Sequence, residues 1–290
     1  RLETPVSIVL PARFFADIVR RLPADQVEIE VNDFFHAVVR SGSTEIQLNG
    51  MDPEEFPSLP VVEEEKGITL SGDLLKTMIR QTTFAVSTSE MTPILTGVLW
   101  SLDGGRLKMV ASDRHRLAYS EADLDVGEEQ SFNNVVIAGK TLNELAKILP
   151  DQDKFVDFFV SQNQVLFKLG NIHFFSRILD GTFPDITKAI SKNFKTETLL
   201  ETGVFRDAME RVSLLSREEK ADIVKMVIQE DGVVELSSSS SELGKVTEKI
   251  ALERMSGEPM RISFNSRYML DAVKVFDGPR IRIGFAGPMS

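Results

Sequence analysis

Apolar residues three and four positions apart recur along the chain and predict amphipathic helices. Phe15, Ile18 and Leu22 form one such stripe within residues 12–22, and the stripe stops at Pro23. Apolar and polar positions then alternate over residues 27–31, as in a strand with one buried face. We therefore expect helices packed on antiparallel sheets. The same change of period predicts four more helices, at residues 72–81, 139–149, 204–217 and 266–276.

An internal repeat underlies this pattern, and repeats of this length indicate duplicated structural units. A shift of 127 residues places Leu22-Pro23 on Leu149-Pro150 and Phe56-Pro57 on Phe183-Pro184 without a gap. A further shift of 127 residues places Leu149 on Phe276. The chain therefore contains three copies of one unit, the third of them unfinished.

A second kind of unit lies between these copies and repeats after about 130 residues. Each of its copies contains two strand-like runs joined by an Asp-Gly turn signal, at Asp103-Gly104 and at Asp231-Gly232. The two kinds of unit thus alternate along the chain. Because the chain starts at Arg1 and stops at Ser290 in an extended-looking segment, we expect both ends to be cut.

Charged residues are distributed unevenly between the predicted helices and the rest of the chain. The chain has 33 Lys and Arg against 44 Asp and Glu, a net charge of −11. The five helical windows hold twelve basic and six acidic residues, so they carry +6 and the remainder carries −17. Helices turned to one common side would suit a polyanion contacted through its phosphates, without sequence preference. Ordinary solvated helix faces explain the pattern equally well, because Lys and Arg are good helix formers.

The cysteine and histidine content limits the possible chemistry. The chain has no Cys and only three His, which lie far apart. This composition excludes disulfides and thiolate metal sites and argues against a histidine-rich metal centre. No apolar run approaches the roughly 20 residues of a membrane span. We expect a soluble, cytoplasmic protein without a cofactor.

The most reactive-looking residues are Asp113-Arg114-His115-Arg116. An Asp two residues from a His is compatible with a general acid–base pair, but no Ser or metal ligand stands at a suggestive spacing. The tripeptide Gly139-Lys140-Thr141 lacks the preceding glycine of a phosphate-binding loop. A hydrolase that uses Asp113 and His115 stays open as an alternative, but the pattern favours a protein without a catalytic site.

Five stretches spread over the chain carry specific motifs, among them SDRHRLA at residues 112–118 and FFSRILDGTFPD at residues 174–185. The others lie at residues 84–90, 93–98 and 262–272. In their order and content they resemble the bacterial sliding clamp family, the beta subunit of DNA polymerase III, in its Firmicutes versions. The resemblance implies an α+β fold of tandem DNA-clamp domains, each with two halves made of a helix and an antiparallel sheet.

The resemblance also implies the domain organisation and the assembly. Residues 1–62 would be the second half of a first clamp domain, residues 66–192 a complete second domain, and residues 196–290 a third domain without its last strands. Lacking its first half, the first domain should expose an unpaired sheet edge. Two full-length chains would form a homodimeric ring in which twelve helices line the inner face around duplex DNA. A topological link of this kind does not depend on tight phosphate contacts.

Three sites carry over from the family residue by residue. The first site is a pocket for client proteins, and this chain has Thr92 where many relatives have Arg, and Ala189 where a larger aliphatic residue is usual. One wall of this client pocket should therefore be shallower. Taken singly, Leu95 and Leu117 are also compatible with ordinary core packing. The pocket, in which client proteins dock a short apolar peptide, is expected at Thr92, Leu95, Ser112, His115, Arg116, Leu117, Pro184 and Ala189. The dimer interface is expected to join Ile46 of one chain to Leu214 and Leu215 of another, and the residues expected to face DNA are Arg13, Arg20, Arg21, Arg80 and Lys140.

The implied function is that of a non-catalytic processivity factor on duplex DNA. Its partners would be the catalytic subunit of DNA polymerase III, the clamp loader and repair proteins. Such a subunit is grouped with DNA-directed DNA polymerases, which are nucleotidyltransferases, only because it belongs to the holoenzyme. The alternative is a monomeric acidic scaffold that binds peptides but not DNA. The two hypotheses predict different oligomeric states and different retention on circular DNA.

Overall fold

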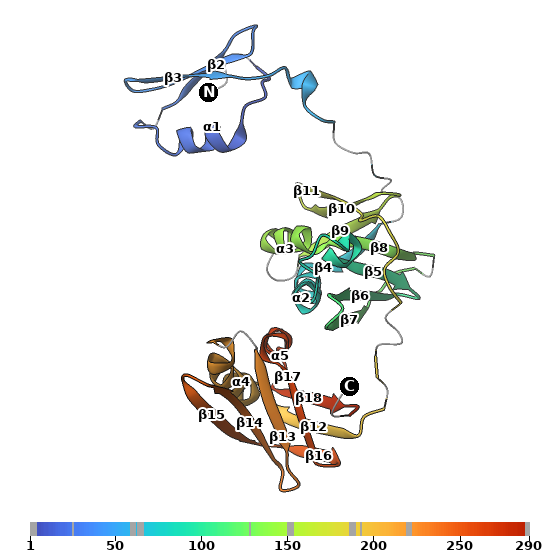
Figure 1. Cartoon of the computed structure of the whole chain (residues 1–290). Helices are drawn as coiled ribbons and strands as arrows, with labels where there is room; N and C mark the ends of the chain where they lie inside the picture. Colours follow the sequence, from blue (N-terminus) through green and yellow to red (C-terminus); the bar gives the residue numbers. More distant parts are fainter. Residues whose placement is uncertain are drawn as a thin grey trace. The chain divides into compact units, whose positions relative to one another are not determined.

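The computed structural model describes residues 5–24, 26–58, 62, 67–127, 129–149, 154–185, 190–191, 193–218 and 222–287. The chain divides into two compact units, residues 1–61 and 62–290. A helix is present at each of the five predicted stretches, although the ends differ by a few residues. The helices are α1 (Ala12–Val19), α2 (Gly72–Thr83), α3 (Gly139–Ile148), α4 (Thr202–Glu218) and α5 (Ser266–Val273) (Figure 1).

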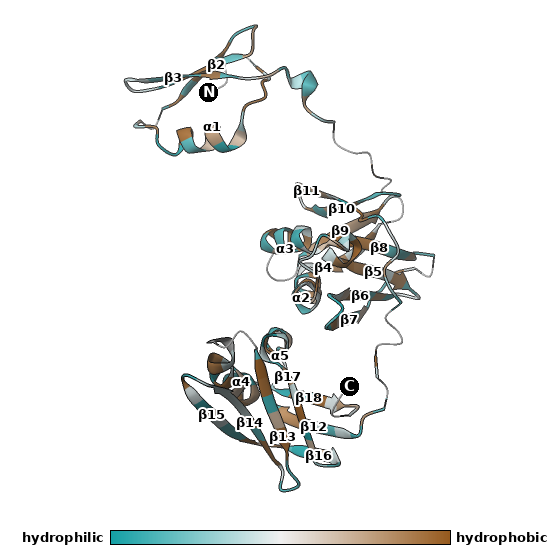
Figure 2. Ribbon diagram, in the orientation of Figure 1, coloured by the Kyte–Doolittle hydropathy of each residue, from teal (hydrophilic) through white to brown (hydrophobic). Residues whose placement is uncertain are grey.

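The first unit is a three-stranded antiparallel sheet with α1 packed on one side. The strands are β1 (Glu28–Val31), β2 (His36–Ser41) and β3 (Thr44–Asn49), in the order β1-β2-β3, and a short 3-10 helix η1 (Pro53–Glu55) follows. The core consists of Ala37, Val39 and Leu48, and the predicted stripe residues Phe15 and Ile18 pack against it. No residue of α1 is fully buried, and hydrophobic and hydrophilic residues are interspersed along the helix (Figure 2).

The central segment of the second unit contains two four-stranded antiparallel sheets, whose shared core also includes residues of α2 and α3. Trp100, Phe158 and Phe167 lie at its centre and are at most 1% exposed. The sheet orders are β11-β10-β9-β4 and β7-β6-β5-β8. The strands are β4 (Ile68–Ser71), β5 (Gly97–Asp103), β6 (Arg106–Ser112), β7 (Leu117–Asp123), β8 (Phe132–Ala138), β9 (Phe155–Val160), β10 (Gln164–Leu169) and β11 (Ile172–Arg177).

The C-terminal segment of the second unit has a separate core, in which Phe205 and Met209 of α4 and Leu270 of α5 pack against two further sheets. The sheet orders are β15-β14-β13-β17 and β16-β12-β18. The strands are β12 (Thr196–Glu201), β13 (Ile223–Ile228), β14 (Val233–Ser240), β15 (Gly244–Ala251), β16 (Arg254–Gly257), β17 (Met260–Asn265) and β18 (Arg280–Phe285).

Each half of the central segment gives its first strand to the sheet of the other half. β4 opens the first half but pairs with β9, and β8 opens the second half but pairs with β5. In the C-terminal segment β17 pairs with β13 and β12 pairs with β18 in the same way. Because neither sheet is complete without a strand from the other half, the two halves share one core.

Residues at equivalent positions of the repeat differ in burial, because in the central segment the other half covers them, whereas the described part of the first unit contains only one half. Val156 on β9 is fully buried beside β4, whereas its counterpart Ile29 on β1 is 45% exposed. Phe183 is 6% exposed and its counterpart Phe56 is 64% exposed. Among the described residues no strand pairs with the outer edge of β1, so the first unit has the unpaired sheet edge that the sequence predicts.

The Asp-Gly turn signals also correspond to hairpins. β5 and β6 are joined through Gly104 and Gly105, whose φ values of 53° and 75° are those that a tight hairpin turn requires. Asp231-Gly232 lies in the turn between β13 and β14. In the part of the chain that the structure describes, no helix combines the length and the hydropathy needed to cross a membrane.

Candidate functional site

The turn between β6 and β7 is held closed by the side chains of its own residues. Asp113 Oδ1 accepts hydrogen bonds from the backbone N–H groups of His115 and Arg116, each at 3.0 Å. Ser112 Oγ donates to the carbonyl of Arg116 at 2.9 Å. Arg114 has a φ of 76°, a left-handed conformation that the turn imposes on a residue other than glycine. This network gives the short turn a defined shape.

Arg116 is the most highly connected residue of this turn. Its Nε donates to Asp113 Oδ2 at 3.1 Å, and its Nη1 donates to Asp271 Oδ2 on α5 at 2.6 Å. The guanidinium carbon lies 4.6 Å from the centre of the Tyr268 ring and 5.5 Å from that of Phe84. The Arg116 side chain is only 18% exposed. Its charge is therefore engaged within the protein.

Asp113 and His115 are not arranged as an acid–base pair. Both carboxylate oxygens of Asp113 are used by the turn amides and by Arg116. The exposed His115 ring stacks on Tyr268, with ring centres 6.1 Å apart and an angle of 20° between the planes. This geometry does not favour the hydrolase alternative.

An apolar cluster lies next to the turn. Leu95, on the 3-10 helix η2 (Pro93–Thr96), is 3% exposed and packs with Val110, Val136 and Phe183. Leu117, at the start of β7, is partly buried against this cluster. Leu95 is thus a core residue, whereas Leu117 keeps some exposed surface.

The remaining residues expected in the client pocket have different surroundings. Arg114 Nη2 donates to Thr92 Oγ1 at 2.6 Å, which ties η2 to the turn. Pro184 is exposed and directly follows the buried Phe183. Ala189 lies outside the described residues. We call Leu95, Leu117, Pro184 and the turn residues 112–116 the docking patch.

Sequence reasoning missed the residues that the third segment contributes next to the docking patch. Asp271 and Tyr268 lie on α5, about 155 positions away from Arg116 and His115. The motif at residues 262–272 drew attention to α5 but did not indicate what it contacts. Val110 and Val136, which support Leu95, were missed because their alternation predicts only a buried strand face.

The residues expected to face DNA are exposed, and several of them have acidic neighbours. Arg20 and Arg21 follow α1 and each lies 3.7 Å from Asp17. Arg80, in the last turn of α2, pairs with Asp277, which follows α5. Arg13 and Lys140 are exposed on α1 and α3.

The observed helices carry less positive charge than the predicted windows. They contain nine basic and seven acidic residues, a net charge of +2 in place of +6. Arg20, Arg21 and Lys274 lie just beyond the ends of α1 and α5, and Glu218 belongs to α4. Cations are favoured near helix C-termini by the helix dipole. Part of the apparent charge segregation therefore has a local structural cause.

The ion pair between Arg80 and Asp277 leads to a prediction about titration. The hydrogen bond from Arg80 lowers the pKa of Asp277 below its ordinary value, because it stabilises the carboxylate. The pair should therefore contribute at neutral pH and be lost as acidification passes through this lowered pKa. NMR titration of Asp277 should show the low pKa, and Arg80→Met should raise it toward the ordinary value. An unchanged pKa in that variant would contradict the pairing.

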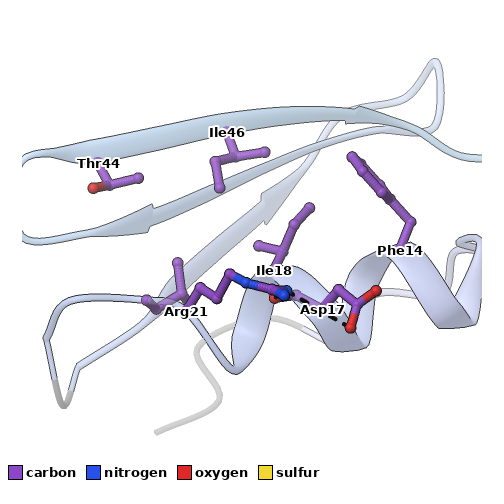
Figure 3. A pocket seen from close by; sticks show the side chains of 7 residues that line it. Phe14, Asp17, Ile18, Arg21, Thr44 and Ile46 are labelled. Atoms are coloured by element: carbon purple, nitrogen blue, oxygen red, sulfur yellow. Dashed lines mark hydrogen bonds and ion pairs between the residues drawn. The ribbon is translucent and has the colours of Figure 1, made fainter.

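The residues expected at a dimer interface lie on exposed surfaces of the two units. A shallow apolar groove of the first unit lies between α1 and β3 and contains Ile46, Phe14 and Ile18, with Asp17 and Arg21 beside them (Figure 3). On α4, Leu214 is 62% exposed and Leu215 is partly buried. β3 and β15 are both edge strands of their sheets. Apolar side chains and a free strand edge are features that a second chain can cover.

Comparison with protein families gives matches along the whole chain. Residues 2–60 match the N-terminal domain of the DNA polymerase III beta subunit, residues 69–185 its central domain, and residues 187–290 its C-terminal domain. The chain is 49% identical to the beta sliding clamp of Bacillus subtilis over 99% of its length and 76% of that relative's length. It is 44% identical to the beta sliding clamp of Staphylococcus aureus, over 98% of this chain and 74% of the relative.

Solved structures give the same result. The crystal structure of the Bacillus subtilis DNA polymerase sliding clamp matches with a TM-score of 0.94 at 49% identity, covering 100% of this chain and 76% of the other. The DNA polymerase III beta chain of Streptococcus pneumoniae matches with a TM-score of 0.90 at 36% identity, covering 99% and 76%. On the strength of these matches and of its repeated helix-and-sheet architecture, the chain belongs to the DNA polymerase III beta subunit family, the beta sliding clamps.

Proposed function

We propose that this protein is a non-catalytic clamp that encircles duplex DNA as a homodimeric ring and tethers the replicative polymerase and other client proteins in the cytoplasm. The observation that carries the proposal is the 49% identity to the Bacillus subtilis beta sliding clamp over 99% of the chain. The clamp function requires neither a cofactor nor an active site, because it rests on enclosure alone.

The repeated architecture supports the ring. Separate family matches and separate cores support a division of the chain into a half domain at residues 1–62, a complete domain at 66–192 and a third domain at 196–290. Enclosure also explains how a protein with a net charge of −11 holds DNA. Weak contacts from residues such as Arg13, Arg20, Arg21 and Lys140 suffice, since dissociation from a closed ring requires opening it.

The docking patch is the proposed site for client peptides. Leu117 and Pro184 offer apolar surface above the buried cluster around Leu95, and His115 and Ser112 provide polar groups at its rim. A few aliphatic or aromatic side chains of a peptide can pack on such a surface. Thr92, bound to Arg114, occupies the position of the longer Arg usual in the family, so this side of the patch is expected to be shallower.

The ring predicts that retention on DNA depends on topology and not on affinity. The protein is assembled on a nicked circular plasmid with a bacterial clamp loader and passed through a sizing column in about 0.5 M NaCl, where open phosphate-binding proteins dissociate. We expect the protein to elute with the circle. Cutting the plasmid once with a restriction enzyme before the column should release nearly all of it.

A matched control separates sliding off an end from damage to the complex. If both ends of the cut plasmid are blocked with bound streptavidin, the protein should again be retained. Equal loss from circular, cut and end-blocked DNA would overturn the ring and favour the monomeric peptide-binding scaffold.

A further inference from the structure

Arg116 belongs at the same time to the docking patch and to the contact between the central and C-terminal segments of the second unit. One face of this contact is the β6–β7 turn, and the other is α5. Arg116 Nη1 reaches Asp271 on α5 at 2.6 Å, and its guanidinium stacks on Tyr268 of the same helix. The second ion pair of this contact, between Arg80 and Asp277, involves none of the docking patch residues. The patch is thus connected to α5 by the ion pair of Arg116 and by the stacking of Arg116 and His115 on Tyr268.

The two carboxylates that share Arg116 are held to different degrees. Asp113 is 14% exposed and also accepts hydrogen bonds from two amides of its own turn. The Asp271 side chain is 35% exposed and meets Arg116 through a single oxygen. A third carboxylate brought to the guanidinium adds like-charge repulsion, which is relieved when the more weakly held of the two carboxylates already there moves away. Asp271 is the one that yields, because Asp113 is anchored by its turn.

The chemistry of the incoming ligand decides whether this exchange occurs. A carboxylate can accept two parallel hydrogen bonds from a guanidinium, so it replaces the hydrogen bond that Arg116 loses when Asp271 moves away. A neutral peptide has no carboxylate to offer. Displacing Asp271 would then break a partly buried ion pair without replacing it, at a net cost in free energy. Asp271, once released, still has access to water.

We propose that the Arg116–Asp271 ion pair is a latch between the docking patch and α5, which a client peptide bearing a carboxylate opens and a neutral apolar peptide leaves closed. The inference rests on the proposed function, since it takes the docking patch to be a peptide site. Its consequence is that acidic clients, but not neutral ones, loosen the contact between the two segments when they bind.

Hydrogen–deuterium exchange of the full chain without ligand tests the latch itself. Asp271→Asn removes the charge but keeps the shape, and Asp277→Asn is the matched control because it breaks a different ion pair of the same contact. We expect Asp271→Asn to speed exchange of residues 112–117 and 266–273 by about fivefold, the effect of losing roughly 1 kcal/mol. Asp277→Asn should leave residues 112–117 unchanged. Arg116→Lys, which keeps the charge but lacks the planar fork, should act like Asp271→Asn. Equal effects of Asp271→Asn and Asp277→Asn on the turn would overturn the latch.

Two peptide probes test its opening. One is an acetylated, amidated hexapeptide of leucine and phenylalanine with one glutamate, and the other has glutamine in place of that glutamate. Both should bind, as measured by fluorescence anisotropy of labelled copies, but only the acidic peptide should speed exchange of α5. In Asp271→Asn it should give no further increase. Binding of the acidic peptide without a change in α5 would overturn the opening. Failure of both peptides to bind would refute both the docking patch and the opening by ligand, while the exchange of the unliganded variants still decides whether the ion pair joins the segments.

Discussion

Replacing Phe158 with alanine is expected to lower the free energy of unfolding of the central segment by about 3–5 kcal/mol. Phe158 is 1% exposed, and its ring centre lies 4.7 Å from that of Phe167 and 5.2 Å from that of Trp100. The substitution removes a large apolar side chain and leaves a cavity where both sheets and both helices meet. Because Trp100 is the only tryptophan of the chain, its fluorescence during urea denaturation reports the unfolding of this core.

A control on the same strand separates the cavity from any effect on strand formation. Phe155 also lies on β9 but is 68% exposed, so Phe155→Ala should change the free energy of unfolding by no more than about 0.5 kcal/mol. Far-UV circular dichroism checks that both variants fold. Similar losses in the two variants would show that the aromatic cluster is not the source of the stability.

Replacing Leu214 with aspartate is expected to abolish dimer formation at micromolar protein concentration. The Leu214 side chain is 62% exposed on α4, so a charge there should be tolerated by the monomer. In the proposed ring it would be desolvated at each of two symmetric interfaces. Loss of a central apolar contact costs about 2–4 kcal/mol, which corresponds to an increase of at least about 30-fold in the dissociation constant per interface.

Sedimentation velocity of the full-length protein measures this directly, with the mass of one chain as the monomer reference. The matched control is Val204→Asp, which places the same charge at a 43% exposed position of the same helix outside the proposed interface. Ile46→Asp, on the opposite surface of the proposed interface, should reproduce the effect of Leu214→Asp. A dimer that persists in Leu214→Asp, or one that Val204→Asp also destroys, would place the interface elsewhere.

Local sequence patterns predicted the helices and turns of this protein better than they predicted the distribution of its charges. The stripe of Phe15 and Ile18 marked α1, and Asp103-Gly104 marked a hairpin. The charge on the helices was predicted less accurately, because the predicted helices extended a few residues too far. Arg20, Arg21 and Lys274 were counted within helices although they follow them.

The candidate site was predicted in part. The motif at residues 112–118 identified the turn, and the structure brings it beside Leu95 and Thr92. The contacts of Arg116 with Asp271 and Tyr268 could not be predicted, since they join segments about 155 residues apart and no periodic pattern encodes such a pairing. The roles of these residues in client binding stay a prediction.

The helices, the tight turns and the alternation of two repeated units were predictable from the amino-acid sequence, because each depends on the order of neighbouring residues. The exchange of first strands between the halves became visible only in the folded protein, as did the burial of Phe183 against Leu95 and Val110, whereas its repeat partner Phe56 is exposed. The ion pair of Arg116 with Asp271 on α5 likewise follows from the folded structure. These outcomes depend on which distant surfaces meet, because burial and charge pairing arise from contacts between segments that local sequence does not specify.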